Sequence, residues 1–171
     1  ATRIAVMKAG NLLQLGSPKE IYENPADLFV AGFMGSPSMN LIPAKVVPAN
    51  GGLAVEVTRT EAAPATLPLA GGNAAWQGYV GREVILGLRP EQISDPTNTE
   101  ARGADVHRID CLVEVTEPTG PDTLAVMMLG GVEATARLRA DTNARPGEVC
   151  PFMVDMGKVC LFDPKSERRI S

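Results

Sequence analysis

The 171-residue sequence is poor in aromatic side chains and contains a single histidine. Aromatic residues make up 4% of the chain, which is few for a protein that stacks the bases of single-stranded nucleic acid. The formal net charge of −4 also disfavours a surface that attracts phosphate backbones. Both observations argue against nucleic acid as a partner.

Cysteine is scarce as well, and no two cysteines form a C-x-x-C pair. Cys111, Cys150 and Cys160 together with His107 would supply four ligands, but their spacings are not those of a zinc finger. We therefore expect structural thiols and no metal site. The odd number of cysteines fits a reducing compartment better than a secreted disulfide scaffold.

Long hydrophobic runs are missing. The longest apolar run, "TLAVMMLGGV", is far shorter than the roughly 20 residues that span a bilayer, and no basic-then-apolar leader opens the sequence. We expect neither a signal peptide nor a transmembrane segment. Association with a membrane protein stays open.

The motifs of common enzyme classes are missing too. The sequence contains no G-x-x-x-x-G-K-[ST] phosphate loop and no G-x-S-x-G nucleophile elbow. His107 has no evident partner that would position it as a base, and we expect an incidental or structural role for it. Glu114 and Glu117 would lie on opposite faces of a strand, so a two-carboxylate mechanism is unsupported. We predict that this chain alone catalyses no reaction and binds no cofactor.

The first part of the sequence predicts a hairpin and a short helix. Two apolar runs within residues 3–15 flank a turn at Gly10. Ser17 and Glu20 are spaced as a capping box, in which each side chain accepts from the backbone N–H of the other residue. The helix should end near Asn24, because the residue before a proline avoids the α-helical region.

A second short helix is predicted directly afterwards. Asn24 would be its N-cap, Pro25 its first residue, and Asp27 an acidic residue of its first turn. The apolar residues of this helix predict a packing stripe that ends before Gly35 and consists of Leu28, Phe29, Phe33 and Met34.

From Asn40 onward the sequence predicts strands. Apolar and polar residues alternate over 53–58, 108–115 and 132–139, as in half-buried strands. The runs "EVILGLR" and "TLAVMMLG" have no clean polar face and predict strands covered on both sides. Gly-rich turns separate seven to nine strands between 41 and 163, which indicates a barrel or sandwich. The polar stretch Asp95–Asp105 predicts a loop or linker.

Several motifs carry a family resemblance. "RIAVMKAGNLLQLGSPKEIYENPADLFVAGFMGSPSMN" closely resembles the segment that closes the nucleotide-binding domain in ATPase subunits of carbohydrate-type ABC importers, such as the maltose importer. That family carries G-x-[LI]-x-Q-x-G, [ST]-P-x-E-[IL]-Y and P-A-x-x-F-V-A-x-F-[IM]-G-S-P-x-M-N in this order. "LGLRPEQI" and "LFDPKSERRI" are similar to motifs of the family's C-terminal β domain. Thr2 stands where the family usually has Asp, a minor departure.

The resemblance implies a fold and a division of the chain. Residues 1–38 would be the C-terminal remnant of an α/β ATPase domain, a hairpin and two short helices. Residues 39–171 would be a mainly β, OB-like domain of short strands that regulates and dimerises the subunit. The resemblance further implies that the parent protein binds ATP and Mg²⁺, that its ATPase motifs precede this segment, and that the segment itself is non-catalytic.

The resemblance also implies partners and a location. The parent would form a homodimer through the β domain and bind permease subunits that work with a periplasmic or extracellular solute-binding protein. It would lie at the cytoplasmic face of the bacterial plasma membrane and import a sugar, a polyol or a glycerol phosphate. The alternative is a β domain that binds a small anion, because related domains bind oxyanions such as molybdate.

Two groups of residues are candidate structural or interface sites. Arg89, Pro90 and Glu91 of "GLRPE" are expected to form polar anchors at the end of a buried strand, with mere closure of a turn as the alternative. The helical stripe of Leu28, Phe29 and Phe33 is expected to have lost part of its cover with the ATPase core. It should seek burial on the β domain or across a dimer.

Overall fold

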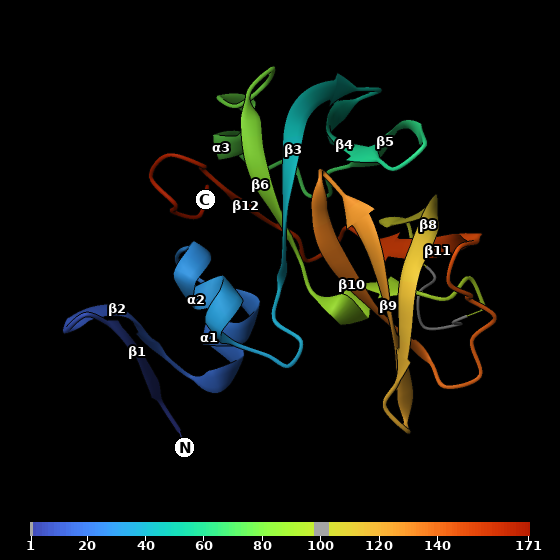
Figure 1. Cartoon of the computed structure of the whole chain (residues 1–171). Helices are drawn as coiled ribbons and strands as arrows, with labels where there is room; N and C mark the ends of the chain where they lie inside the picture. The colour runs from blue at the N-terminus through green and yellow to red at the C-terminus, as the bar shows by residue number, and fades with distance from the viewer. Residues whose placement is uncertain (1, 98–102) are drawn as a thin grey trace.

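The structure, a computed structural model, describes residues 2–97 and 103–171 and consists mainly of β-strands (Figure 1). The helical elements are α1 (Pro18–Glu23), α2 (Leu28–Phe33), α3 (Ala74–Gln77) and the 3₁₀ turn η1 (Pro90–Gln92). The strands are β1 (Ile4–Lys8), β2 (Asn11–Gly16), β3 (Asn40–Ala49), β4 (Gly52–Arg59), β5 (Ala62–Pro68), β6 (Glu83–Leu88), β7 (Ile93–Ser94), β8 (Val106–Pro118), β9 (Asp122–Leu129), β10 (Val132–Arg139), β11 (Val149–Asp155) and β12 (Cys160–Phe162).

The predicted hairpin and first helix are confirmed. Strands β1 and β2 pair in antiparallel fashion across a turn in which Gly10 has a φ of 81°. The Ser17 hydroxyl accepts from the Glu20 amide at 3.2 Å, and the Glu20 carboxylate accepts from the Ser17 amide at 2.8 Å. This capping box satisfies N–H groups that a helix start leaves without partners, so α1 begins where the sequence indicates.

The predicted start of the second helix is wrong. Helix α2 begins at Leu28 with Asp27 as its N-cap, whose carboxylate accepts from the Val30 amide at 2.9 Å. Asn24 is not the cap, because its amide closes the end of α1 by donating to the Glu20 carbonyl at 2.8 Å.

The predicted apolar stripe of α2 is displaced. The buried residues of this helix are Val30 and Ala31, whereas the Phe33 side chain is 62% exposed. Phe29 is half-buried, and its ring stacks on Phe33 with the centroids 6.0 Å apart. Val30 packs against Val6 and Ile21, whereas Ala31 packs against Met39 and Phe162. Helix α2 is therefore buried between the hairpin and the β-sheet, and Phe33 lies outside both contacts.

The second part of the chain forms one strongly curved sheet. Ten strands pair antiparallel in the order β12-β6-β3-β4-β9-β8-β11-β7, with β10 added beside β9 and β5 beside β4. The sequence predicted seven to nine strands, fewer than the ten that the described residues form, among which β7 has only two residues. Asn40 connects β3 to β10, because its side-chain amide donates to the Thr135 carbonyl and accepts from the Thr135 amide. The curvature thus brings the two parts of the sheet together, as in an OB-like architecture.

The alternating patterns mark buried faces as predicted, except in β4, where Ala54 of the opposite face is also buried, and in β8. In β10, Ala134, Ala136 and Leu138 are buried and the residues between them are not. In β8 the alternation stops at Val115, which is 53% exposed. A register shift between Val113 and Val115 in the β8–β9 pairing is the cause, because a bulge turns every later side chain to the other face.

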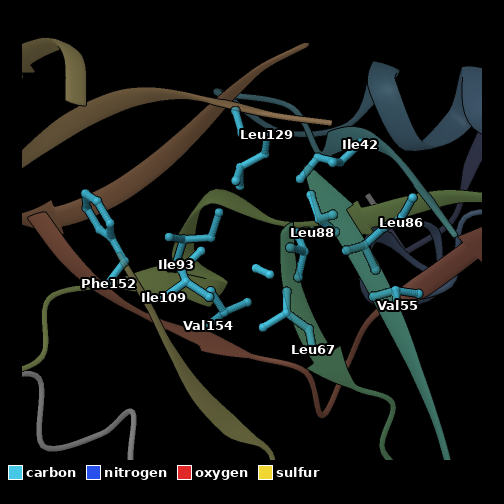
Figure 2. Packing of buried hydrophobic residues seen from close by; sticks show 14 of the residues in the cluster. Ile42, Val55, Leu67, Leu86, Leu88, Ile93, Ile109, Leu129, Phe152 and Val154 are labelled. Atoms are coloured by element: carbon cyan, nitrogen blue, oxygen red, sulfur yellow. The ribbon is translucent and has the colours of Figure 1, made fainter. Parts of the chain in front are cut away.

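The main core fills the space inside the curved sheet (Figure 2). Side chains from strands far apart in the sequence converge there, which the close view shows for Ile42, Leu67, Leu88, Leu129 and Val154. Strand β6 is buried along most of its length, in agreement with the prediction from "EVILGLR". Strand β9 instead alternates between buried and half-buried residues, so its second face is partly open.

The predicted loop Asp95–Asp105 lies partly on residues 98–102, outside the described residues, and the flanking residues form turns and bends.

Within 2–97 and 103–171, none of the helices has the length and apolar character needed to cross a membrane.

Candidate functional site

Arg89 occupies the junction between the small helices and the β-sheet. It follows the last residue of β6, is only 5% exposed, and has the extended backbone expected for a residue before proline. Pro90 then opens η1. A charged side chain is seldom buried this deeply unless its donors are bonded, so its partners define the site.

The Arg89 guanidinium bonds to carbonyl oxygens at the ends of both helices. Nη2 donates to the Tyr22 carbonyl in the last turn of α1 at 2.6 Å. Nη1 donates to the Met34 carbonyl, just after α2, at 2.5 Å, and to the Ala31 carbonyl at 3.5 Å. Helix ends leave their last carbonyls without partners, and a cation is favourable there. We call this arrangement the arginine clamp.

Aromatic stacking and a short hydrogen bond surround the clamp. The guanidinium carbon lies 3.9 Å from the centroid of the Tyr22 ring, and the Tyr22 hydroxyl donates to Glu91 Oε1 at 2.5 Å. Burial, followed by the bond to Glu91, raises the pKa of Tyr22 to about 12. Burial lowers the pKa of Arg89, whereas Tyr22 and Glu91 act in the opposite direction. Arginine starts from such a high pKa that the clamp stays charged at neutral pH.

The clamp also holds the turn that carries it. The Arg89 amide donates to Gln92 Oε1 at 2.7 Å, and Gln92 Nε2 donates to the Asp155 carbonyl on β11 at 3.0 Å. Gly35, with a φ of 106°, lies beside this turn, and an added Cβ would lie 3.0 Å from the Pro37 carbonyl oxygen. The backbone at Gly35 therefore favours glycine for its conformation and for this close contact.

An apolar cluster supports the clamp on the β12 side. It joins α2 to the sheet through Ala31, Met39, Cys160 and Phe162, against which Leu28, Leu41 and Ile85 pack partly buried. The hairpin and helices have a separate small cluster, formed by Val6, Ile21 and Val30 with four half-buried neighbours. Helix α2 therefore belongs to two apolar clusters and links them.

The segment after β12 runs along the junction between α1 and α2 (Figure 1). The Leu28 amide donates to the Glu167 carbonyl at 3.0 Å, and the Arg169 amide donates to the Ala26 carbonyl at 3.0 Å. The Arg169 guanidinium also donates to Asn24 Oδ1 at 2.8 Å. The clamp thus bonds the C-terminal ends of the two helices, whereas this segment bonds the residues between them and the start of α2.

Asp163 shapes the turn at the start of that segment. Its carboxylate accepts from the amides of Lys165 and Ser166 and from the Tyr79 hydroxyl, each at 2.8 Å. These hydrogen bonds, led by the one from Ser166, lower the pKa of Asp163 to about 2. The ionised form is therefore the one that the turn requires.

The structure brings the two groups of candidate residues together only in part. Arg89, Pro90 and Glu91 form one cluster at the clamp, and Leu28 packs beside it. Phe29 and Phe33 lie on the hairpin side of α2, where Lys8 Nζ is 4.8 Å from the Phe29 ring. Tyr22 was not predicted as a site residue, and the segment after β12 was noted only for the resemblance of "LFDPKSERRI" to a family motif. The signal for Tyr22 was its place at the end of the capped helix, where carbonyls need donors.

Cavities near the clamp offer no evident anion site. A hollow of about 250 Å³ is lined by Glu91 and Asp155 as well as by Lys158, which pairs with Glu23 at 3.5 Å. In the described residues, no group of three or more His, Cys, Asp or Glu side chains is arranged to hold a metal ion. The three cysteines are free and buried.

Part of the β-sheet and the clamp residue Arg89 fall within a known family model. Residues 35–93 match the family model described as the MalK OB fold domain. The matched segment contains Arg89, whereas the helical carbonyls that Arg89 bonds lie just before this segment in the chain. The arginine clamp thus joins the segment that matches the MalK OB fold model to the residues that precede it.

Homologues extend the match to the whole chain. The chain is 36% identical to the trehalose/maltose import ATP-binding protein MalK of Thermococcus litoralis over 98% of its own length and 44% of that protein. It is also 36% identical to the sn-glycerol-3-phosphate import ATP-binding protein UgpC of Cupriavidus necator, over 99% of the chain and 44% of that protein. The chain therefore spans less than half the length of these relatives, which are ATP-binding subunits of ABC importers.

A solved structure is also similar. The cytoplasmic molybdate-binding protein ModG, with molybdate bound, matches with a TM-score of 0.47 and 14% sequence identity. The match covers 73% of the chain and 96% of that protein. At this TM-score and sequence identity, the match supports no conclusion about a ligand of this chain.

The arginine clamp predicts that loss of the Arg89 side chain destabilises the folded chain more than loss of an exposed arginine. Arg89→Ala should lower the free energy of unfolding by roughly 2–4 kcal/mol, because it leaves buried carbonyls without donors. Urea unfolding followed by circular dichroism measures this change. The matched control is Arg82→Ala, since Arg82 lies 4.6 Å from the Tyr79 ring but is exposed, and its loss should cost about 1 kcal/mol or less. Equal losses for both variants would contradict the clamp.

Asp163 predicts a dependence of stability on pH. Its pKa lies below the ordinary value of 3.8 in the folded state, so its contribution is present above that value and is lost as the pH falls toward 2. Asp163→Asn should lower the melting temperature at pH 7, and the difference from the wild type should shrink between pH 5 and about 2. The control is Asp110→Asn, an exposed carboxylate paired with Arg108 at 3.1 Å. A difference that is constant with pH would refute the assignment.

Proposed function

We propose that this chain is the regulatory and dimerising part of the ATP-hydrolysing subunit of an ABC importer for sugars or related solutes, such as polyols or glycerol phosphate. The similarity over the whole chain to importer ATP-binding subunits supports this proposal. Because the chain spans less than half of these relatives, the activity of the whole protein remains part of the proposal.

The arginine clamp is the observation that carries the proposal. A regulatory domain influences an ATPase only if its position relative to the ATPase is fixed, since a loose tether transmits no orientation. Here one buried guanidinium bonds the ends of α1 and α2 from within the β domain. We therefore assign residues 1–38 to the end of the ATPase domain and 39–171 to the β domain, with the clamp as their rigid joint.

The dimerising role follows from the work that the parent protein has to do. In an ATPase dimer whose two catalytic faces separate during each cycle, a second contact has to persist. A rigid β domain that stays paired keeps the two catalytic faces at a high effective concentration. In this proposal the parent binds ATP and Mg²⁺ through residues outside this chain. It sits at the cytoplasmic face of the membrane on permease subunits, which receive solute from a binding protein.

The non-catalytic character of the chain is tested by titration with Mg-ATP. We expect no heat of binding in calorimetry at nucleotide concentrations up to the millimolar range, because the phosphate loop is absent from the sequence. A full-length relative that carries the phosphate loop is the positive control. Micromolar binding by this chain would overturn the assignment.

Self-association tests the dimerising role. Sedimentation at low micromolar concentration should show a homodimer with a specific interface that buries about 1,200–2,000 Å² in total. Phe33→Ser is the matched variant, because Phe33 is 62% exposed on α2 and offers an alternative apolar contact. A dimer that persists in this variant is the expected result. A wild-type monomer, or a dimer lost on this substitution, would show that the β domain does not hold the subunits together.

A further inference from the structure

Two of the three cysteines lie directly opposite each other on neighbouring strands. Cys111 of β8 is the register partner of Cys150 of β11. Both side chains are buried, at 3% and 8% exposure, and both belong to the core inside the sheet. Directly opposed residues of an antiparallel pair point to the same face, so the two thiols are neighbours.

The position of Pro151 shows which kind of pair the cysteines form. Pro151 is opposite Asp110, and a proline has no N–H to donate to the ladder. Hydrogen-bonded and non-bonded pairs alternate in an antiparallel ladder, so the cysteines next to Pro151 form a hydrogen-bonded pair. Val113 and Glu148 are each two residues from the cysteine of their own strand, so the alternation predicts a hydrogen-bonded pair there too. The Val113 amide does donate to the Glu148 carbonyl, at 2.9 Å.

This geometry is close to that of a disulfide. Opposed residues in a hydrogen-bonded pair have Cα atoms about 5.5 Å apart, inside the range of roughly 4.4–6.8 Å found for disulfides. Their Cβ atoms lie near the wider end of the range of about 4.5–5.5 Å, because non-hydrogen-bonded pairs are the closer ones, and have to approach by about 1–2 Å to reach disulfide distance.

The two thiols differ in their access to solvent. Cys150 lines a hollow of about 430 Å³ together with Thr142, Ala144 and Pro151, and its Sγ donates weakly to the Glu148 carbonyl at 3.8 Å. Cys111 lies deeper, and burial raises its pKa to about 11. A small reagent therefore reaches Cys150 first, and Cys111 is placed to attack the product.

We propose that Cys111 and Cys150 are a modification site that forms an intramolecular disulfide by exchange with a low-molecular-weight disulfide such as glutathione disulfide. The Cys150 thiolate attacks one sulfur of the reagent, the reagent S–S bond breaks, and one glutathione leaves as thiolate. The Cys111 thiolate then attacks the Cys150 sulfur, forms the cross-strand bond and releases the second glutathione. The two protons of the cysteines pass to the two released thiolates, so one disulfide is reduced as another forms.

The bond would close a loop that contains β9, β10 and the turns up to β11. A cross-link over a loop of this length restricts the unfolded chain more than the folded one. The midpoint of thermal unfolding should therefore rise by about 5–10 °C on oxidation and return on reduction. Cys160 has no such neighbour, since it lies on β12 in the cluster with Ala31, Met39 and Phe162. It serves as an internal control.

The experiment incubates the folded chain with glutathione disulfide, followed by denaturation, alkylation with N-ethylmaleimide and peptide mass mapping. We expect one alkylated cysteine, Cys160, in place of the three in the reduced chain, and a linked pair of peptides that contain Cys111 and Cys150. Cys160→Ala should oxidise at the wild-type rate. Cys111→Ala should stop at a mixed disulfide on Cys150, and Cys150→Ala should retain both remaining thiols.

Several results would overturn the proposal. One is the recovery of three free thiols after prolonged incubation, and another is a stable glutathione adduct on Cys150 in the wild type. A disulfide bond to Cys160 or between two chains, or oxidation of Cys160 at the rate of the pair, would also overturn it. Because all variants start from the reduced chain, their melting temperatures before oxidation show whether they are folded. A variant that fails to fold is replaced by the corresponding serine substitution, and the wild-type peptide map decides the outcome in either case.

Discussion

The hydrogen bonds from the Arg89 guanidinium to the carbonyls of two short helices are the constraint on which the arrangement of the chain depends. Helices of six residues are too short to be stable by themselves, so α1 and α2 need tertiary contacts. The buried cation supplies bonds that water would otherwise provide at the helix ends. The same residue follows β6, which is buried in the core, so the rigidity of the sheet extends to the helices.

The sequence predicted correctly those parts of the fold that depend on contacts between residues close together in the chain. The capping box at Ser17, the hairpin turn at Gly10 and the alternating strands were all readable, because each rests on contacts between neighbours in the sequence. The start of α2 was mispredicted because Asn24 closes α1 and bonds Arg169, a partner 145 residues away. The exposure of Val115 depends on a bulge set by a partner strand, which no local pattern reveals.

The central residues of the candidate site were predicted from the sequence, whereas the residues that surround them were not. The "GLRPE" motif indicated polar anchors at a strand end, and Arg89 and Glu91 do bond residues of α1. No local pattern indicated that Tyr22 would stack on the guanidinium, because this contact joins residues 67 positions apart. The burial of Leu28 and the exposure of Phe33 likewise depend on tertiary contacts, because the cluster at β12 covers Leu28 and leaves Phe33 open.

The segment after β12 has a consequence for the order in which the chain folds. Its amides and carbonyls bond Ala26 and Leu28, so a translating ribosome has to make well over a hundred further residues before this junction is complete. Contacts of such long sequence separation form late and slow the search for the native state. During synthesis the helix pair is therefore open to chaperones and proteases, even after the strands that match the MalK OB fold model have emerged.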